Sequence, residues 1–188
     1  DHSIRMITYR QNIDSEKNRE ISLLEKSQRD SLTELYNKRK TEELITRSLK
    51  SDSDTQSKHA FLIFDIDDFK NINDNLGHDF GDFVILEFAK ELKRQFRDTD
   101  IVGRIGGDEF VVLLKNYGDR GRLCDKLQDV CPKLVRDYIG KKRGYGVAAS
   151  IGAALFPEHG ATYDDLYARA DEALYFSKGH GKKTLLMR

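Results

Sequence analysis

The sequence has no net charge and no long hydrophobic run, and these two absences exclude several classes of protein. Its 188 residues include 32 basic and 32 acidic side chains, which cancel. A balanced chain lacks the long-range field that attracts nucleic acid or an anionic membrane surface, so we expect neither partner. No stretch approaches the roughly 20 apolar residues of a membrane-spanning helix, and the first residues lack the apolar core of a signal peptide. We therefore predict a soluble segment that makes no membrane contact.

Cysteine is also scarce. Cys124 and Cys131 lie in one predicted helical region, and no histidine accompanies them at metal-ligand spacing. Buried or partly buried thiols are therefore favoured over a metal site, and they fit a reducing, cytoplasmic location. The sequence has no obvious natural start, so we expect a piece of a longer protein. That protein is either soluble or a membrane-bound sensor whose cytoplasmic part is this chain.

Ten phenylalanines, eight tyrosines and 38% apolar residues are enough to build one core. Residues 1–29 are polar, with apolar positions at loose helical spacing, and we interpret them as a helical linker or lead-in. Two forms stay open for it: a solvated terminal helix, or a coiled coil that joins two copies of the chain. Residues 30–188 are predicted to form the folded domain.

Hydrophobic periodicity and turn signals divide this domain into alternating helices and strands. No repeat of 20 to 50 residues is present. Alternation of this kind, with one antiparallel hairpin, predicts an α/β (α+β) fold in which helices cover a mixed sheet. The predicted helices cover residues 30–49, 85–96, 119–139 and 162–177, and the strands cover 60–65, 100–105, 110–114, 147–155 and a short segment after 183.

A hairpin between the second and third strands carries the first candidate site. Gly106 and Gly107 join these strands, which predicts a tight two-residue turn with positive φ at both glycines. Asp108 and Glu109 follow at once and are held on a stiff hairpin. Alone this signal is weak, because turns favour glycine and aspartate for backbone reasons.

A second acidic group stands at the end of a buried strand. Asp65 follows the apolar run 60–64, so Asp65 and Asp108 can form an all-oxygen site for a hard divalent cation. A cation there would polarise a phosphoryl oxygen, which points to phosphoryl or nucleotidyl transfer. The alternative, that these acids cap helices or pair with surface lysines, stays open.

Candidate phosphate contacts lie on both sides of this acidic pair. Phe69 and Lys70 open the segment after the first strand, where backbone N–H groups at a helix start can hold phosphates. Lys178 and Lys182, near the C-terminus, can add positive charge. The alternative for these lysines is an ordinary basic helix end, which spacing alone favours.

Asn73 and Asp82 can together read guanine, because an amide and a carboxylate match the acceptors and the N1 and N2 donors of its edge. Spacing alone favours capping and turn roles, and Asp82 directly after Gly81 suggests a helix N-cap.

Taken together, these motifs resemble the GGDEF-domain diguanylate cyclases from Asp30 to the C-terminus. Several linked motifs in one order make chance a poor explanation. The motifs are Asp30-Ser-Leu-Thr-Glu-Leu-Tyr-Asn37, Phe64-Asp-Ile-Asp-Asp-Phe-Lys70, Asn73-Asp-Asn-Leu-Gly-His-Asp-Phe-Gly-Asp82, Gly106-Gly-Asp-Glu-Phe110, Ser150-Ile-Gly152 and Arg169-Ala-Asp-Glu-Ala-Leu-Tyr175.

The resemblance implies a nucleotide-cyclase-like palm with a central sheet of about five strands. It implies that two GTP molecules, one on each subunit of a homodimer, condense to cyclic di-GMP with loss of pyrophosphate, and that a sensor domain lies upstream. Two Mg²⁺ or Mn²⁺ ions per site would be bound by Asp65, the Ile66 carbonyl and Asp108, with Asp108 and Glu109 helping to activate the hydroxyl. The remaining roles it implies are guanine binding by Asn73 and Asp82, and phosphate binding by Phe69, Lys70, Lys178 and Lys182.

An inhibitory product site is a further expectation. Arg97 and Asp100, which end five residues before Gly106, match the family's RxxD motif, although a surface arginine at a helix end is the alternative. The sequence departs from the family pattern at Lys182, where many members have arginine, so bidentate binding of phosphate at this position is in doubt.

Two other functions compete with the cyclase. A degenerate domain that binds GTP or cyclic di-GMP as a receptor is the main alternative, but the intact acids argue against it. A cyclase that makes hybrid adenine and guanine products is disfavoured by Asp82, because an unprotonated adenine N1 would face a carboxylate.

Overall fold

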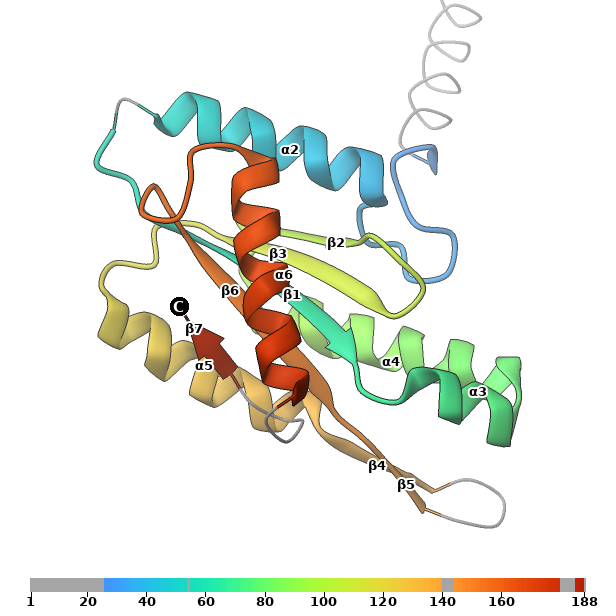
Figure 1. The fold of residues 1–188 in the computed structure, drawn as a ribbon. Coiled ribbons are helices and arrows are strands. Elements are labelled where there is room, and N and C mark those ends of the chain that lie inside the picture. The colour runs from blue at the N-terminus through green and yellow to red at the C-terminus, as the bar shows by residue number, and fades with distance from the viewer. Residues whose placement is uncertain (1–25, 54, 140–143, 180–184, 188) are drawn as a thin grey trace, which may run out of the picture.

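The computed structural model describes residues 26–53, 55–139, 144–179 and 185–187. Helices and strands alternate along them, as the sequence predicts (Figure 1). The helices are α2 (Lys38–Asp52), α3 (Phe69–Leu76), α4 (His78–Gln95), α5 (Arg120–Leu134) and α6 (Tyr163–Gly179). The strands are β1 (His59–Ile66), β2 (Ile101–Arg104), β3 (Glu109–Leu114), β4 (Arg136–Ile139), β5 (Gly144–Val147), β6 (Ala149–Phe156) and β7 (Leu185–Met187).

A mixed sheet of five strands forms the centre, in the order β2-β3-β1-β6-β7. Strand β1 pairs antiparallel with both β3 and β6, and β7 runs parallel to β6. Every residue of β1 is buried, because helices cover both faces of the sheet. The predicted mixed sheet of about five strands is confirmed.

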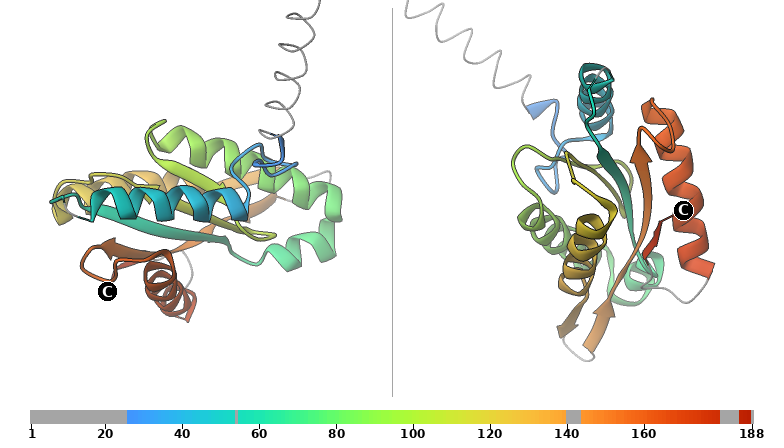
Figure 2. Two further views of the ribbon diagram at one scale, coloured as in Figure 1. Left: turned by 90° about the horizontal axis from the view of Figure 1, so that it is seen from above. Right: turned by 90° about the vertical axis from the view of Figure 1, so that its left-hand side faces the viewer.

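The core has one layer on each face of the sheet (Figure 2). Leu62 and Phe64 of β1 pack with the apolar faces of α4 and α5. Phe61 and Ile63 point to the opposite face, where they pack with α2 and α6. This alternation follows from the two-residue period of a strand. Strand β1 is therefore held between two layers of helices.

The first predicted helix begins later than expected. Helix α2 starts at Lys38 rather than near residue 30, because the Asn37 side chain accepts a hydrogen bond from the Lys40 N–H and caps it. Ahead of it, the Asp30 carboxylate accepts from the Thr33 N–H at 2.9 Å and holds a turn. Side chains that hydrogen-bond to nearby backbone groups compete with helix formation, and here they keep residues 30–37 out of the helix.

The predicted helix over 119–139 is also wrong at its end. Helix α5 stops at Leu134, and β4 follows and pairs antiparallel with β5 in a separate two-stranded sheet. Cys124 and Cys131 are partly buried free thiols on α5, as expected.

The linker prediction for residues 1–29 falls almost wholly outside the described residues, so the boundary at residue 30 stays a prediction. Among the helices that the structure describes, none is long and apolar enough to cross a membrane.

Candidate active site at the end of the central strands

The hairpin of β2 and β3 brings the predicted acids to one end of the sheet. Asp65, near the end of β1, lies opposite Glu109 in the ladder with β3. Ile66 and Asp108, the next residues toward the turn, are also adjacent, because the Ile66 N–H donates to the Asp108 carbonyl at 3.2 Å. The predicted convergence of Asp65 with the hairpin acids is confirmed.

The turn itself differs from the prediction. Residues 105–108 separate the strands, and neither Gly106 nor Gly107 has a positive φ. The N–H groups of Ile105 and Gly106 both point to the Glu109 carbonyl, at 3.0 and 3.4 Å, which closes a wider loop that needs no left-handed residue. Gly106 serves close approach instead, because an added Cβ would lie 2.7 Å from a carboxylate oxygen of Glu109.

Arg104 braces this turn, a role that sequence reasoning missed. Its Nε and Nη2 donate to the Gly107 carbonyl at 3.1 and 2.7 Å, and its Nη1 donates to the Asp30 carboxylate at 2.9 Å. Burial favours a higher pKa for Asp30, but hydrogen bonds from Thr33 and Arg104 outweigh it and lower the pKa. The only signal in the sequence is an arginine two residues before the glycine pair.

Negative charge accumulates at the end of these strands. Burial raises the pKa of Asp108, and the nearby Asp65 carboxylate raises it further. Burial and the same neighbour, with Asp108, raise the pKa of Glu109. Lys178, from the last turn of α6, opposes both effects. Its Nζ lies 2.8 Å from the Asp65 carboxylate.

The donor set fits a hard divalent cation. Asp65, Asp108 and the Ile66 carbonyl supply only oxygen atoms, the ligand type that Mg²⁺ and Mn²⁺ prefer. The ammonium of Lys178 on Asp65 shows that a cation can lie there. Across the described ranges, no three His, Cys, Asp or Glu side chains converge into a ready-made metal cluster. The three oxygen donors, one of them a backbone carbonyl, stay a predicted site.

The start of α3 lies directly after the acidic end of β1. Phe69 and Lys70 form its first turn, and the side chain of the preceding residue, Asp68, does not cap it. Asp68 itself has φ 57°, in the left-handed region that is uncommon for a residue other than glycine. The first N–H groups of an α-helix have no partner within the helix, so those of Phe69 and Lys70 stay predicted phosphate donors.

A buried polar contact fixes this crossover from β1 to α3. The Ser150 hydroxyl of β6 donates to the Asp67 carboxylate at 2.7 Å, and the Asp67 N–H donates to the Ala148 carbonyl at 2.8 Å. Ser150 is completely buried. The Ser150-Ile-Gly152 motif by itself does not predict this role for the serine.

The predicted guanine contacts come together on α3 and α4. Gly81 allows this, because a Cβ there would lie 1.9 Å from Oδ1 of Asn73, so the amide rests directly on α4 at the residue before Asp82. Asp82 is exposed and lies inside α4, whose N-cap is Gly77. The N-cap interpretation of Asp82 is therefore wrong.

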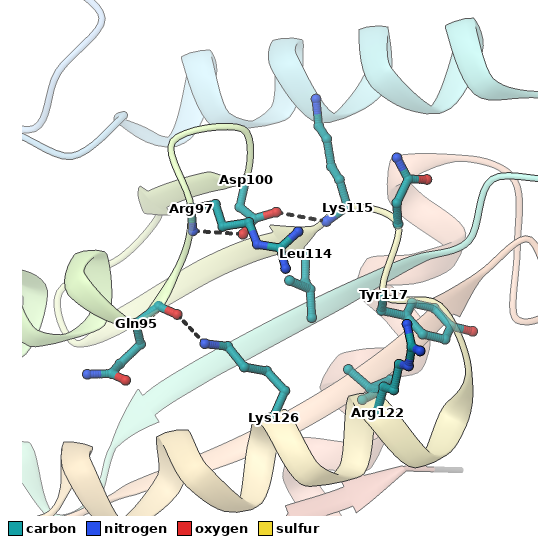
Figure 3. A pocket seen from close by; sticks show the side chains of 10 residues that line it. Gln95, Arg97, Asp100, Leu114, Lys115, Tyr117, Arg122 and Lys126 are labelled. Atoms are coloured by element: carbon teal, nitrogen blue, oxygen red, sulfur yellow. Dashed lines mark hydrogen bonds between the residues drawn. The ribbon is translucent and has the colours of Figure 1, made fainter.

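The predicted inhibitory pair divides into two different roles. Asp100 is buried, and its carboxylate accepts from the backbone N–H groups of Arg97 and Lys115 at 2.9 and 3.0 Å. Asp100 therefore holds the chain between α4 and β2 against the end of β3. The exposed Arg97 lines a cavity of about 300 Å³ together with Arg122 and Lys126 of α5 (Figure 3). Asp100 lines the same cavity, and the inhibitory pair stays a prediction.

Of the remaining predicted contacts, Lys182 lies outside the described residues. The structure brings Asp65, Asp108, Glu109 and Lys178 to one end of the sheet, and Asn73 lies against Gly81, the residue before Asp82.

Comparison with known proteins gives one consistent result. Residues 27–184 match the family described as diguanylate cyclase, GGDEF domain. The chain is 38% identical over 160 residues to the diguanylate cyclase TpbB of Pseudomonas aeruginosa, which covers 84% of this chain and 36% of that protein. The chain thus spans just over a third of the length of TpbB.

Solved structures agree. The GGDEF domain of TpbB is 33% identical, with a TM-score of 0.78, over 84% of this chain and 92% of that one. The GGDEF domain of DgcB from Caulobacter crescentus, in complex with c-di-GMP, is 25% identical, with a TM-score of 0.76, over 85% and 92%.

Proposed function

This chain belongs to the GGDEF-domain family of diguanylate cyclases, and we propose that it condenses two molecules of GTP into cyclic di-GMP and two pyrophosphates. The observation that carries this proposal is the pairing of Asp65 with the Asp108-Glu109 turn across β1 and β3. Degenerate relatives that act as receptors would not need these acids intact.

Asp65, Asp108 and the Ile66 carbonyl would hold two Mg²⁺ or Mn²⁺ ions. When bound, these ions polarise the phosphoryl oxygens and favour loss of the proton from the attacking hydroxyl. Glu109, whose pKa is raised by burial and by Asp65, is suited to accept that proton.

In each half-reaction the 3′-oxygen of one GTP forms a bond to the α-phosphorus of the other. The bond from that phosphorus to the bridging oxygen of pyrophosphate breaks, and pyrophosphate leaves with its electron pair. Two such steps close the ring. Because one domain would hold one GTP, the reaction needs two copies of the site facing each other, and we propose a homodimer.

Asn73 and Asp82 would select guanine, since Asp82 can accept from N1–H and the N2 amino group while Asn73 binds the same edge. The first N–H groups of α3, at Phe69 and Lys70, would bind phosphate oxygens, and Lys178 and Lys182 would add charge. The Asn73 amide lies against Gly81, the residue before Asp82, which supports this assignment.

We also propose that the product inhibits the enzyme through Arg97, whose guanidinium can contact phosphate or the guanine edge. The cavity that Arg97 and Asp100 share with Lys115, Arg122 and Lys126 supports an anionic ligand. Added cyclic di-GMP should lower the initial rate, and an unchanged rate would contradict the proposal. We further propose that the protein is cytoplasmic and that a sensor domain lies upstream of this chain.

The test is incubation with GTP, ATP and Mg²⁺, followed by identification of the products. We expect cyclic di-GMP alone, at a rate per subunit that rises steeply with protein concentration, and none from the Asp108→Ala variant. A hybrid product would overturn the guanine assignment. No dinucleotide at any protein concentration would favour the receptor, which the binding of labelled GTP or cyclic di-GMP would then identify.

A further inference from the structure

We propose that Lys178 is the resident cation of the active site and makes metal binding at Asp65 depend on the nucleotide. The inference rests on the proposed function only in taking Asp65 as a metal ligand. It predicts that the site accepts a metal–nucleotide complex readily and the free metal ion poorly.

The contact that carries the inference joins the end of α6 to the end of β1. Nζ of Lys178 lies 2.8 Å from Oδ2 of Asp65, whose side chain is only 11% exposed. The lysine side chain is 40% exposed, so its stem reaches inward from the rim of the site. Helix α6 packs along β6, the strand beside β1, which sets the distance between the two groups.

The charges around this contact are strongly unbalanced. The negative charges of Asp65, Asp108 and Glu109 act on one another, and Asp171 of α6 adds a fourth negative charge that acts on Glu109. Arg104 acts on Asp108, but its guanidinium is bound to the turn carbonyl and to Asp30. Of the residues that the structure describes, Lys178 is therefore the cation in direct contact with Asp65, and it takes the position beside this carboxylate that a metal ion would take.

A divalent cation at Asp65 competes with this ammonium for the carboxylate. An ammonium and a metal ion on the same carboxylate repel each other, and in a half-buried site this repulsion is only weakly screened. A metal ion that arrives alone therefore loses part of its binding free energy to breaking the ion pair. A metal ion that arrives with a triphosphate offers Lys178 new anionic partners, so the ammonium moves from carboxylate to phosphate.

Lysine suits this exchange better than arginine would. Its charge is compact and sits on a flexible four-carbon stem, so it can change partners without moving the helix. A planar guanidinium would bind both oxygens of Asp65 in a fixed geometry and would be harder to displace.

The experiment measures Mn²⁺ binding without nucleotide, by the loss of the free-ion signal in electron paramagnetic resonance. In Lys178→Met, which keeps the length of the side chain, we expect Mn²⁺ alone to bind up to about fivefold more tightly, the range for loss of one partly exposed ion pair. With guanosine 5′-(α,β-methylene)triphosphate present, the same variant should bind Mn²⁺ and nucleotide more weakly than the parent protein.

Lys133→Met is the matched control, since Lys133 also lies in the last turn of its helix and pairs with a carboxylate, Asp129, at 2.6 Å. It should leave both affinities unchanged. Lys178→Arg keeps the charge and should not strengthen binding of Mn²⁺ alone. Thermal unfolding of each variant establishes that it folds.

The two opposite effects of Lys178→Met separate this inference from its alternatives. A lysine that only stabilises the fold would change the melting temperature and leave Mn²⁺ affinity unchanged, which would overturn the inference. Weaker binding of Mn²⁺ alone, or tighter binding in Lys178→Arg, would overturn it as well. None of these measurements needs turnover, so failure of the proposed function would be recognised separately by the absence of product.

Discussion

Replacing Gly81 by alanine should make the protein more stable and a poorer enzyme. Gly81 lies inside α4 with an ordinary φ, so alanine fits the backbone. The new methyl group would lie 1.9 Å from Oδ1 of Asn73 and 3.2 Å from the edge of the Phe69 ring. Because ordinary contact begins near 3.4 Å, the amide must retreat by more than an ångström from its place against Gly81.

The substitution has two energetic effects: it stabilises the helix, and it weakens the binding of GTP. Alanine in place of glycine inside a helix stabilises it by about 0.5–1 kcal/mol. A gain of that size raises the melting temperature of a domain of this length by about 1–4 °C, less whatever the displaced amide costs. Loss of one hydrogen bond to guanine costs about 0.5–1.5 kcal/mol, which corresponds to a KM for GTP that is about 2- to 13-fold higher.

The assay is steady-state cyclase kinetics together with thermal unfolding, carried out on Gly81→Ala, Asn73→Ala and the double variant. The cycle isolates the contact between the two positions. If the methyl group acts by displacing the amide, it should add nothing to KM once the amide is gone. An equal increase in KM in both backgrounds would refute the reasoning, as would an unchanged KM in Gly81→Ala.

Three further predictions concern the residues that hold the site. Arg104→Ala should lower kcat about 10- to 100-fold in steady-state kinetics, since a loosened turn misplaces the acids, and Arg104→Lys should not restore it. Ser150→Ala should lower the free energy of unfolding by about 1–3 kcal/mol in urea titrations, because the Asp67 carboxylate loses a buried donor. Raised pKa values at Asp108 and Glu109 mean that the folded protein holds protons that the unfolded chain releases above about pH 4. Their contribution to stability is present below about pH 4 and is lost as the pH rises through the raised pKa values. The melting temperature of the metal-free protein should therefore fall as the pH rises, and Asp108→Asn should make that fall smaller.

Much of the fold could be predicted because its signals are local. The buried run of β1, the periodic apolar face of α4 and the turn residues around α6 each depend on neighbours within a few positions. The predictions failed where a local signal had two outcomes. The segment 30–37 had helical composition, yet Asp30 and Asn37 bind nearby backbone groups and delay the helix to Lys38.

The same limit applies to β4 and to the glycine pair. Residues 136–139 continue a helical pattern, and only pairing with β5 makes them a strand. Gly106 and Gly107 predicted a two-residue turn, but the register between β2 and β3 sets a longer loop. Register depends on how both strands pack, which no local window contains.

The sequence by itself determined the family to which its motifs belong, and it supplied the candidate groups: two acids at strand ends, and an amide and a carboxylate proposed to bind a base. Only the tertiary structure decided how those residues are supported. Arg104 reaches 74 positions back along the chain to Asp30, Ser150 reaches 83 positions back to Asp67, and Lys178 comes from the last helix to rest on Asp65. Such contacts leave no periodic trace, because the fold brings together residues whose spacing along the chain is arbitrary. The identity of the catalytic groups is therefore encoded locally, whereas their geometry and charge balance are set by packing.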